Sequence, residues 1–192
     1  MNSDVSVQNI FPNFIGTKSL DLSKLKVLGT TFKKTFESNI KTTIDSETLF
    51  DVDSMNYLNI ELTTILSHLL KNKCKTFVFR LTGIWINQYN DKDFQGPHVH
   101  PGDYSFIIYY KCKKSYTVFN SPAKNMILRT AKPIPNLFPT DYEVNLKQGD
   151  VVMFPSYLEH WVKPNSDAIT IAGNVKIMEL NDKHFDVNDI MI

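Results

Sequence analysis

The sequence has few of the features that mark several classes of protein. Its two cysteines, Cys74 and Cys112, stand far apart and form no Cys-x-x-Cys pair, which favours a reducing cytoplasm. No apolar run is long enough to cross a bilayer, and no secretion signal opens the chain. Lysine plus arginine (21) nearly balance aspartate plus glutamate (20), so the net charge of +1 gives no field to gather nucleic acid or an anionic membrane.

What the chain does have is apolar and aromatic content sufficient for one core. With 192 residues, 42% hydrophobic and 12% aromatic, we expect a single domain spanning residues 1–192. Its composition changes near residue 75. We therefore expect a helical and irregular N-terminal part, residues 1–74, followed by a barrel, residues 75–180.

One amphipathic helix is predicted in the N-terminal part. Asp53 and Ser54 are capping-type residues, and the segment after them carries apolar residues on one helical face. His68 lies inside this helix but off the apolar stripe, so we expect a partly exposed histidine there. The stripe consists of Leu58, Leu62, Ile65, Leu66, Leu69 and Leu70.

The rest of the chain is predicted to be mainly β. From Lys75 the helical period gives way to alternation and to β-branched and aromatic residues. Such a series of short strands favours an antiparallel jelly roll or cupin-like barrel. We expect a loop over 91–97, a Pro-rich loop or lid over 131–140, and strands over 10–17, 75–90, 104–112, 115–120, 126–130, 142–146, 151–155, 158–164 and 168–177.

Three histidines form the candidate site. His98 and His100 are two residues apart, so both side chains project to one side if the segment is extended. His160 follows a Gly-Asp turn and a predicted strand. Neutral imidazole is the commonest protein ligand for borderline divalent metals, and three such groups leave positions open for water or a substrate. We therefore predict a catalytic metal at these histidines. His184, in the polar tail, is expected to be a surface residue.

The residues around these histidines form a wider pattern that resembles the 2-oxoglutarate and iron(II)-dependent oxygenases of bacteria and marine phages. The resemblance covers most of the chain, and the Phe-Pro-Ser-x-Leu-x-His-x-Val-x-Pro-Asn block is its most specific part. It implies a double-stranded β-helix with iron at its mouth. The residues that carry it are Trp85, Asn87, Tyr89, Gln95, His98, His100, Pro101, Ser105, Tyr109, Tyr110, Gly149, Asp150, Phe154, Pro155, Ser156, Leu158, His160, Val162, Pro164, Asn165 and Asn174.

The chain departs from the wider superfamily at the second ligand. There the pattern is His-x-Asp/Glu with a distant histidine, whereas His100 occupies the carboxylate position in this sequence. Either three histidines hold the metal, or Asp103 supplies the carboxylate. Three histidines are geometrically simpler, because Asp103 lies an odd number of residues beyond both His98 and His100 and would face away in a regular strand.

A second departure concerns 2-oxoglutarate. Relatives are expected to pair its distal carboxylate with an arginine on the strand after the last ligand, because a planar guanidinium matches a carboxylate. This chain has Ala168-Ile169-Thr170 there and no arginine in that strand. The sequence leaves the replacement open. The candidates are the cations Lys176, Lys111, Arg80 and Arg129 and the hydrogen-bonding tyrosines Tyr109 and Tyr110. Asn87 and Asn174 are polar residues in apolar strands that we expect to line the cavity, and Asn174 is also a candidate for cofactor binding.

The expected function is a non-haem iron oxygenase. The resemblance implies Fe(II) and 2-oxoglutarate as cofactors, dioxygen as co-substrate, and hydroxylation of a small molecule or peptide whose identity the sequence does not give. Two alternatives remain open: a three-histidine, cupin-type dioxygenase or isomerase that does not use 2-oxoglutarate, and a non-catalytic jelly roll such as a phage accessory protein. We expect a cytoplasmic location, or the host cytoplasm for a phage protein, and no nucleic-acid or membrane partner. The sequence leaves the oligomeric state open, with a homodimer as one option.

Overall fold

The computed structural model describes residues 5–10, 13–28, 32–34, 40–43, 49–71, 76–130 and 139–179. The elements, in chain order, are β1 (Ser6–Ile10), β2 (Asn13–Ser19), the 3-10 turn η1 (Leu22–Lys24), β3 (Lys33–Lys34), β4 (Lys41–Thr42), α1 (Val52–Leu69), β5 (Phe77–Tyr89), β6 (Asp93–His98), β7 (Tyr104–Lys111), β8 (Thr117–Asn120), α2 (Lys124–Thr130), β9 (Asp141–Glu143), β10 (Asp150–Pro155), β11 (His160–Asn165) and β12 (Ala168–Glu179). No helix within these ranges has the length and apolar character needed to span a bilayer.

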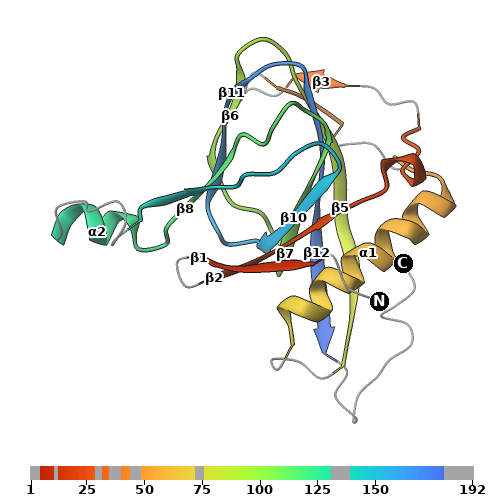
Figure 1. Cartoon of the computed structure of the whole chain (residues 1–192), viewed down its shortest axis with the longest axis horizontal. Coiled ribbons are helices and arrows are strands. Elements are labelled where there is room, and N and C mark those ends of the chain that lie inside the picture. The colour runs from red at the N-terminus through yellow and green to blue at the C-terminus, as the bar shows by residue number, and fades with distance from the viewer. Residues whose placement is uncertain are drawn as a thin grey trace.

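The strands form two antiparallel sheets. The large sheet has the order β1-β2-β10-β7-β12-β5-β4-β3, and the small sheet has the order β6-β11-β8-β9. Helix α1 contacts β2 of the large sheet, and Figure 1 shows it running diagonally past β12 and β5, whereas β6 and β11 lie toward the opposite end of the barrel. This is the mainly β, double-stranded β-helix arrangement that the sequence predicted. The amphipathic helix α1 lies between β4 and β5 in the chain, so strands that precede it also belong to the large sheet.

Strand β7 shows how alternation divides the core. Phe106 and Ile108 are fully buried among the residues that pack with α1, whereas Ile107 and Tyr109 belong to the second apolar cluster, which also takes residues from the small sheet. Successive side chains on a strand point to opposite faces, so one strand serves both cores. The large sheet is therefore the middle layer between α1 and the small sheet.

Helix α1 begins earlier than the sequence suggested. Asp51, rather than Asp53 or Ser54, is the N-cap, and its carboxylate accepts a hydrogen bond of 2.9 Å from the Ser54 amide. The helix packs closely on β2 at Gly16, where an added Cβ would lie 2.5 Å from Cγ2 of Ile65. The close approach of helix and sheet thus depends on the absence of a side chain at this position.

Two sequence predictions about local structure were wrong. The segment 126–130 was predicted to be a strand because it is apolar, but it lies in α2. Ser121-Pro122 explains the helix: the Ser121 hydroxyl accepts from the Ala123 amide, and proline suits a first helical turn. Second, most of the predicted loop 91–97 forms β6. Pro97 is tolerated there because β6 is an edge strand of the small sheet.

The remaining strand predictions are confirmed apart from their ends, and the early strand over 10–17 proves to be two paired strands, β1 and β2. Of the proposed lid over 131–140, residues 131–138 lie outside the described residues, as does His184.

Candidate metal centre

Two of the three histidines are brought together by strand pairing. His98 is the last residue of β6, His160 is the first residue of β11, and the two are direct partners in the antiparallel pair. Residues that face each other across such a pair have Cβ atoms about 5 Å apart. Their ring centroids are 4.3 Å apart, so β-sheet register alone joins two parts of the chain that are 62 residues apart in sequence (160 minus 98).

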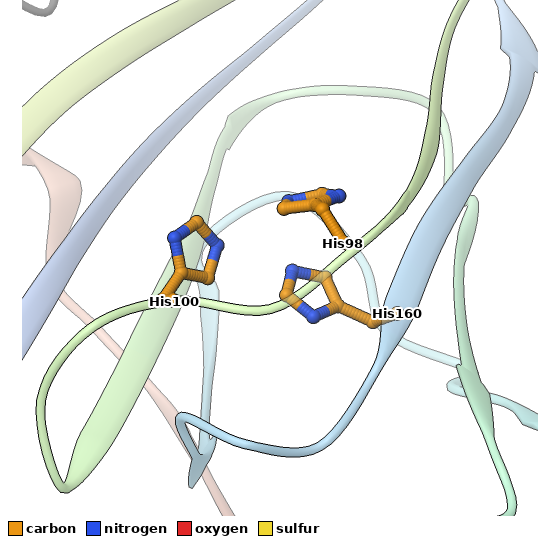
Figure 2. Close-up of side chains that lie close together, drawn as sticks. All are labelled: His98, His100 and His160. Atoms are coloured by element: carbon orange, nitrogen blue, oxygen red, sulfur yellow. The ribbon is translucent and has the colours of Figure 1, made fainter.

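The third histidine comes from the bend after β6. The amide of His100 donates a hydrogen bond of 3.0 Å to the carbonyl of Ser156, which ties this bend to the loop before β11. The ring of His100 lies 4.9 Å from that of His98 and 5.1 Å from that of His160. Figure 2 shows the three rings turned toward a common space, and one nitrogen from each lies within 4.8 Å of the others.

Backbone carbonyls set the tautomer of two of these rings. Nδ1 of His98 is 2.8 Å from the carbonyl oxygen of Gly96, and Nδ1 of His160 is 3.1 Å from that of Leu158. A carbonyl oxygen can only accept, so each Nδ1 carries the hydrogen, and in the neutral ring Nε2 keeps a free lone pair. Nε2 is therefore the nitrogen of His98 and His160 that is available to a metal.

Burial keeps two rings of the cluster, those of His100 and His160, uncharged. Desolvation, assisted by the neighbouring His98, lowers the pKa of His100 to about 4. His160 is 1% exposed, and its pKa lies well below the ordinary value because of desolvation and then the charges of His98 and His100. These rings stay neutral at physiological pH, which is the state that binds metals.

Aromatic side chains wall the cluster. Trp85 lies 5.3 Å from His100 between ring centroids, while Phe154 and Phe119 lie 4.7 and 5.7 Å from His160. Phe119 and Phe154 are fully buried. The side of His160 that these two rings cover is therefore shielded from water.

The histidines open onto a pocket between the two sheets, which encloses about 490 Å³ of empty space including its opening to solvent. Its walls mix apolar side chains with hydroxyl, amide and thiol groups. They are formed by Trp85, Asn87, Tyr89, Gln95, His98, His100, Ile107, Tyr109, Cys112, Lys114, Tyr116, Thr117, His160, Val162, Asn165, Ala168, Thr170 and Ala172.

Asp103, the alternative ligand considered from sequence, is engaged elsewhere. One carboxylate oxygen lies 3.0 Å from Nζ of Lys176, and the other accepts a hydrogen bond of 2.8 Å from the Ile177 amide. Asp103 does not belong to the group of ligand atoms formed by the three histidines. The bend after β6 thus turns this carboxylate toward β12 instead of toward the cluster.

Of the four candidates for cofactor binding, one lines the pocket and three do not. Tyr109 lines the pocket and donates a hydrogen bond of 2.9 Å to the Thr117 hydroxyl. Arg80, Lys176 and Asn174, which the sequence also suggested, do not line it. Arg80 is exposed and Lys176 pairs with Asp103.

Asn174 is buried, and its amide oxygen accepts from the Ser105 hydroxyl at 3.0 Å, so it serves packing beneath the site. The other asparagine expected in the cavity, Asn87, does line it. The notable residue that sequence reasoning missed is Lys114, which lines the pocket from the turn between β7 and β8. Its neighbour Lys113 looks the same in the sequence, and only the fold separates the two.

Comparison with protein families gives one match over the barrel. Residues 83–174, which run from β5 to β12 and include all three histidines, match the family described as "Putative 2OG-Fe(II) oxygenase". A comparison with curated proteins finds no match.

Solved structures resemble this chain at low sequence identity, and the first of them supports the same fold. An oxidoreductase of the 2OG-Fe(II) oxygenase family from Burkholderia pseudomallei is 11% identical with a TM-score of 0.51, over 77% of this chain and 72% of that one. HygX from Streptomyces hygroscopicus, solved with nickel, 2-oxoglutarate and hygromycin B, is 10% identical with a TM-score of 0.49, over 81% and 74%. A viral collagen prolyl hydroxylase from Paramecium Bursaria Chlorella virus-1, in complex with 2OG, is 12% identical with a TM-score of 0.47, over 72% and 79%.

Proposed function

We propose that this protein is an enzyme that hydroxylates an organic substrate and that His98, His100 and His160 hold its iron. The proposal is supported by the match of residues 83–174 to the 2-oxoglutarate and iron(II)-dependent oxygenase family. The observation that carries the proposal is the convergence of three imidazole nitrogens within 4.8 Å at the end of a pocket, inside the matched segment. Fe(II), 2-oxoglutarate and dioxygen are the partners that the family requires.

The residues present fit Fe(II). Imidazole nitrogens suit iron, and three of them on one side leave the remaining positions open. Neutrality is secured by the lowered pKa of His100 and His160, and the Gly96 and Leu158 carbonyls orient two of the rings. The donor set lacks the usual carboxylate, so the protein contributes no negative charge to the metal. Because three neutral ligands leave the full positive charge on Fe(II), binding of the dianion 2-oxoglutarate is favoured.

The chain's own part in the reaction is positioning and exclusion of water. Fe(II), when bound, supplies the activation of dioxygen coupled to decarboxylation of 2-oxoglutarate. Phe119 and Phe154 cover one side of His160 and keep bulk water away from it. Trp85 packs against His100 and limits its rotation. The hydroxyls of Tyr109 and Thr117 offer hydrogen bonds deeper in the pocket.

The test is an anaerobic titration of metal-free protein with Fe(II) and then 2-oxoglutarate. We expect one equivalent of iron and then the weak visible charge-transfer band of a chelated 2-oxo acid. His160→Ala should lose both, whereas His68→Ala, on α1 and outside the cluster, should retain both. Iron binding without the band would favour a three-histidine dioxygenase that does not use 2-oxoglutarate. Failure of the wild-type protein to bind iron would refute the proposal.

A further inference from the structure

The pocket has two ends, which the strand pairing defines. At the histidine end, Ala172 of β12 pairs with Trp85 of β5, whose ring contacts His100. At the far end, Ala168 pairs with Tyr89, and both line the pocket. Alternate residues on a strand are about 6.7 Å apart, so the two ends are separated by about 13 Å. A short, elongated molecule can therefore lie along the pocket with one end at the histidines.

Between the two ends the pocket offers neutral hydroxyl groups. Thr170 pairs with Tyr109 across β12 and β7, and the Tyr109 hydroxyl donates to Thr117. Burial raises the pKa of Tyr109 and of Tyr89, so both phenols stay protonated. These groups can hydrogen-bond to an anion but carry no charge that would balance it.

Lys114 is the one lysine or arginine among the described residues that line this pocket. Its ammonium lies 5.3 Å from the ring centroid of Tyr116, which also lines the pocket and holds the cation by a cation–π contact. No carboxylate among the described residues forms an ion pair with Lys114. This positive charge is therefore available to a ligand.

A second observation at the same pocket points to a missing donor. Asn165 is 5% exposed, and its amide nitrogen donates to the carbonyl of Lys163 at 3.0 Å. Its side-chain oxygen is buried and has no hydrogen-bond partner. Such an unpaired acceptor is costly, and an ammonium group that enters the pocket satisfies it.

We propose that Lys114 binds the distal carboxylate of 2-oxoglutarate, in place of the arginine that β12 lacks. The ammonium has three donors, enough for the ligand carboxylate and for the Asn165 oxygen together. The 2-oxo acid end then lies at the histidines, with the Tyr109 and Thr117 hydroxyls along the chain of the ligand. This assignment rests on the proposed function. The family pattern places an arginine on the strand after His160, whereas Lys114 lies between β7 and β8.

The test compares two ligands on Fe(II)-loaded, anaerobic protein. 2-Oxoglutarate carries the distal carboxylate, whereas 2-oxopentanoate has the same chain without it. Lys114→Gln should weaken 2-oxoglutarate binding about 10- to 100-fold, the usual loss for a hydrogen bond to a charged group. Binding of Fe(II) and of 2-oxopentanoate should stay unchanged. Lys114→Arg should recover part of the loss, and Lys113→Gln, an adjacent exposed lysine outside the pocket, should behave as wild type.

The outcomes separate the two proposals. Equal affinity of wild type and Lys114→Gln for 2-oxoglutarate, in protein that does bind it, would overturn the role of Lys114 and leave the proposed function standing. A parallel loss for both ligands would overturn it too, because the variant would then have damaged the site in general. If Fe(II)-loaded wild type binds no 2-oxoglutarate, both proposals fail.

Discussion

His98 and His160 are direct cross-strand partners on β6 and β11, with ring centroids 4.3 Å apart. The pairing is irregular immediately beyond them, with register shifts between His160 and Val162 and between Val162 and Asn165. Of the three partner pairs between these strands, His98–His160, Gln95–Val162 and Asp93–Asn165, the first alone joins two ring side chains, and the two rings are tilted by 52°. The bend that follows β6 then adds His100, so the small sheet and its adjoining bend supply the whole candidate ligand set.

The position of Asp103 predicts that it is not a metal ligand. Asp103→Asn should bind Fe(II) with unchanged affinity, since the carboxylate contacts Lys176 and the Ile177 amide instead of the histidine cluster. Stability should fall by no more than about 1 kcal/mol, because the ion pair is partly exposed and the asparagine oxygen can still accept from Ile177. Metal titration and urea unfolding measure the two effects. A tenfold or larger loss of iron affinity would make Asp103 a ligand.

The close packing around Gly173 leaves no room for a side chain at this position. An added Cβ would lie 2.6 Å from Cζ of Phe106 and 2.7 Å from the backbone oxygen of Gly83. Gly173→Ala should therefore lower the free energy of unfolding by about 1–3 kcal/mol through overpacking. Gly96→Ala is the matched control, because no atom lies within 4 Å of its added Cβ. Equal unfolding midpoints in urea for the two variants would contradict the packing shown here.

The buried histidines predict a pH dependence of the metal-free fold. The pKa of His100 is lowered to about 4 in the folded protein, so below its ordinary value of 6.5 the unfolded chain binds a proton that the fold does not. Stability should therefore fall as the pH drops from 7 to 5, by about 2 kcal/mol from His100 alone. Urea unfolding in the presence of a chelator measures this.

A matched variant isolates the contribution of His100. His100→Asn cannot take up that proton, so its loss of stability between the same two pH values should be smaller than that of the wild type. Identical losses in the two proteins would show that other groups cause the effect.

We expect the thiol of Cys112, which lines the pocket, to react slowly with alkylating reagents. Burial, with a smaller contribution from the Asp150 carboxylate, raises the pKa of its thiol, so little thiolate is present near neutral pH. Iodoacetamide should alkylate Cys112 more slowly in the folded protein than in protein unfolded in urea, and peptide mass analysis separates it from Cys74. Equal rates in both states would mean that the thiol is freely accessible.

Much of the barrel could be predicted from sequence because its strands are locally encoded. Apolar residues alternate along β7 and β12, and this alternation indicates which residues face each side of the large sheet. Gly149, in the turn predicted before β10, has a φ of +91°, which glycine adopts readily. The two wrong predictions, at α2 and β6, arose where a second signal opposed the one used for the prediction. In α2, the helix-starting residues Ser121 and Pro122 favour a helix although the apolar run that follows suggested a strand. In β6, pairing with β11 produces a strand although the segment contains glycine and proline.

The site was only partly predictable for a different reason. His98 and His100 are close in sequence, and His160 stands in a recognisable block, so local reasoning finds them. Lys114 stands in no such pattern, and its place in the pocket follows from the pairing of β8 with β11 and of β7 with β12. Non-local register of this kind is not readable from a single sequence.

The location of all three histidines on β6, its following bend and β11 has a consequence for the lifetime of the protein. A metal held there links an edge strand with irregular pairing to its neighbour, and it favours the closed form of that edge by mass action. Proteases cleave segments that open. Iron-free protein should then be cleaved at this edge sooner than iron-loaded protein, so the metal would set the lifetime of the chain as well as its chemistry.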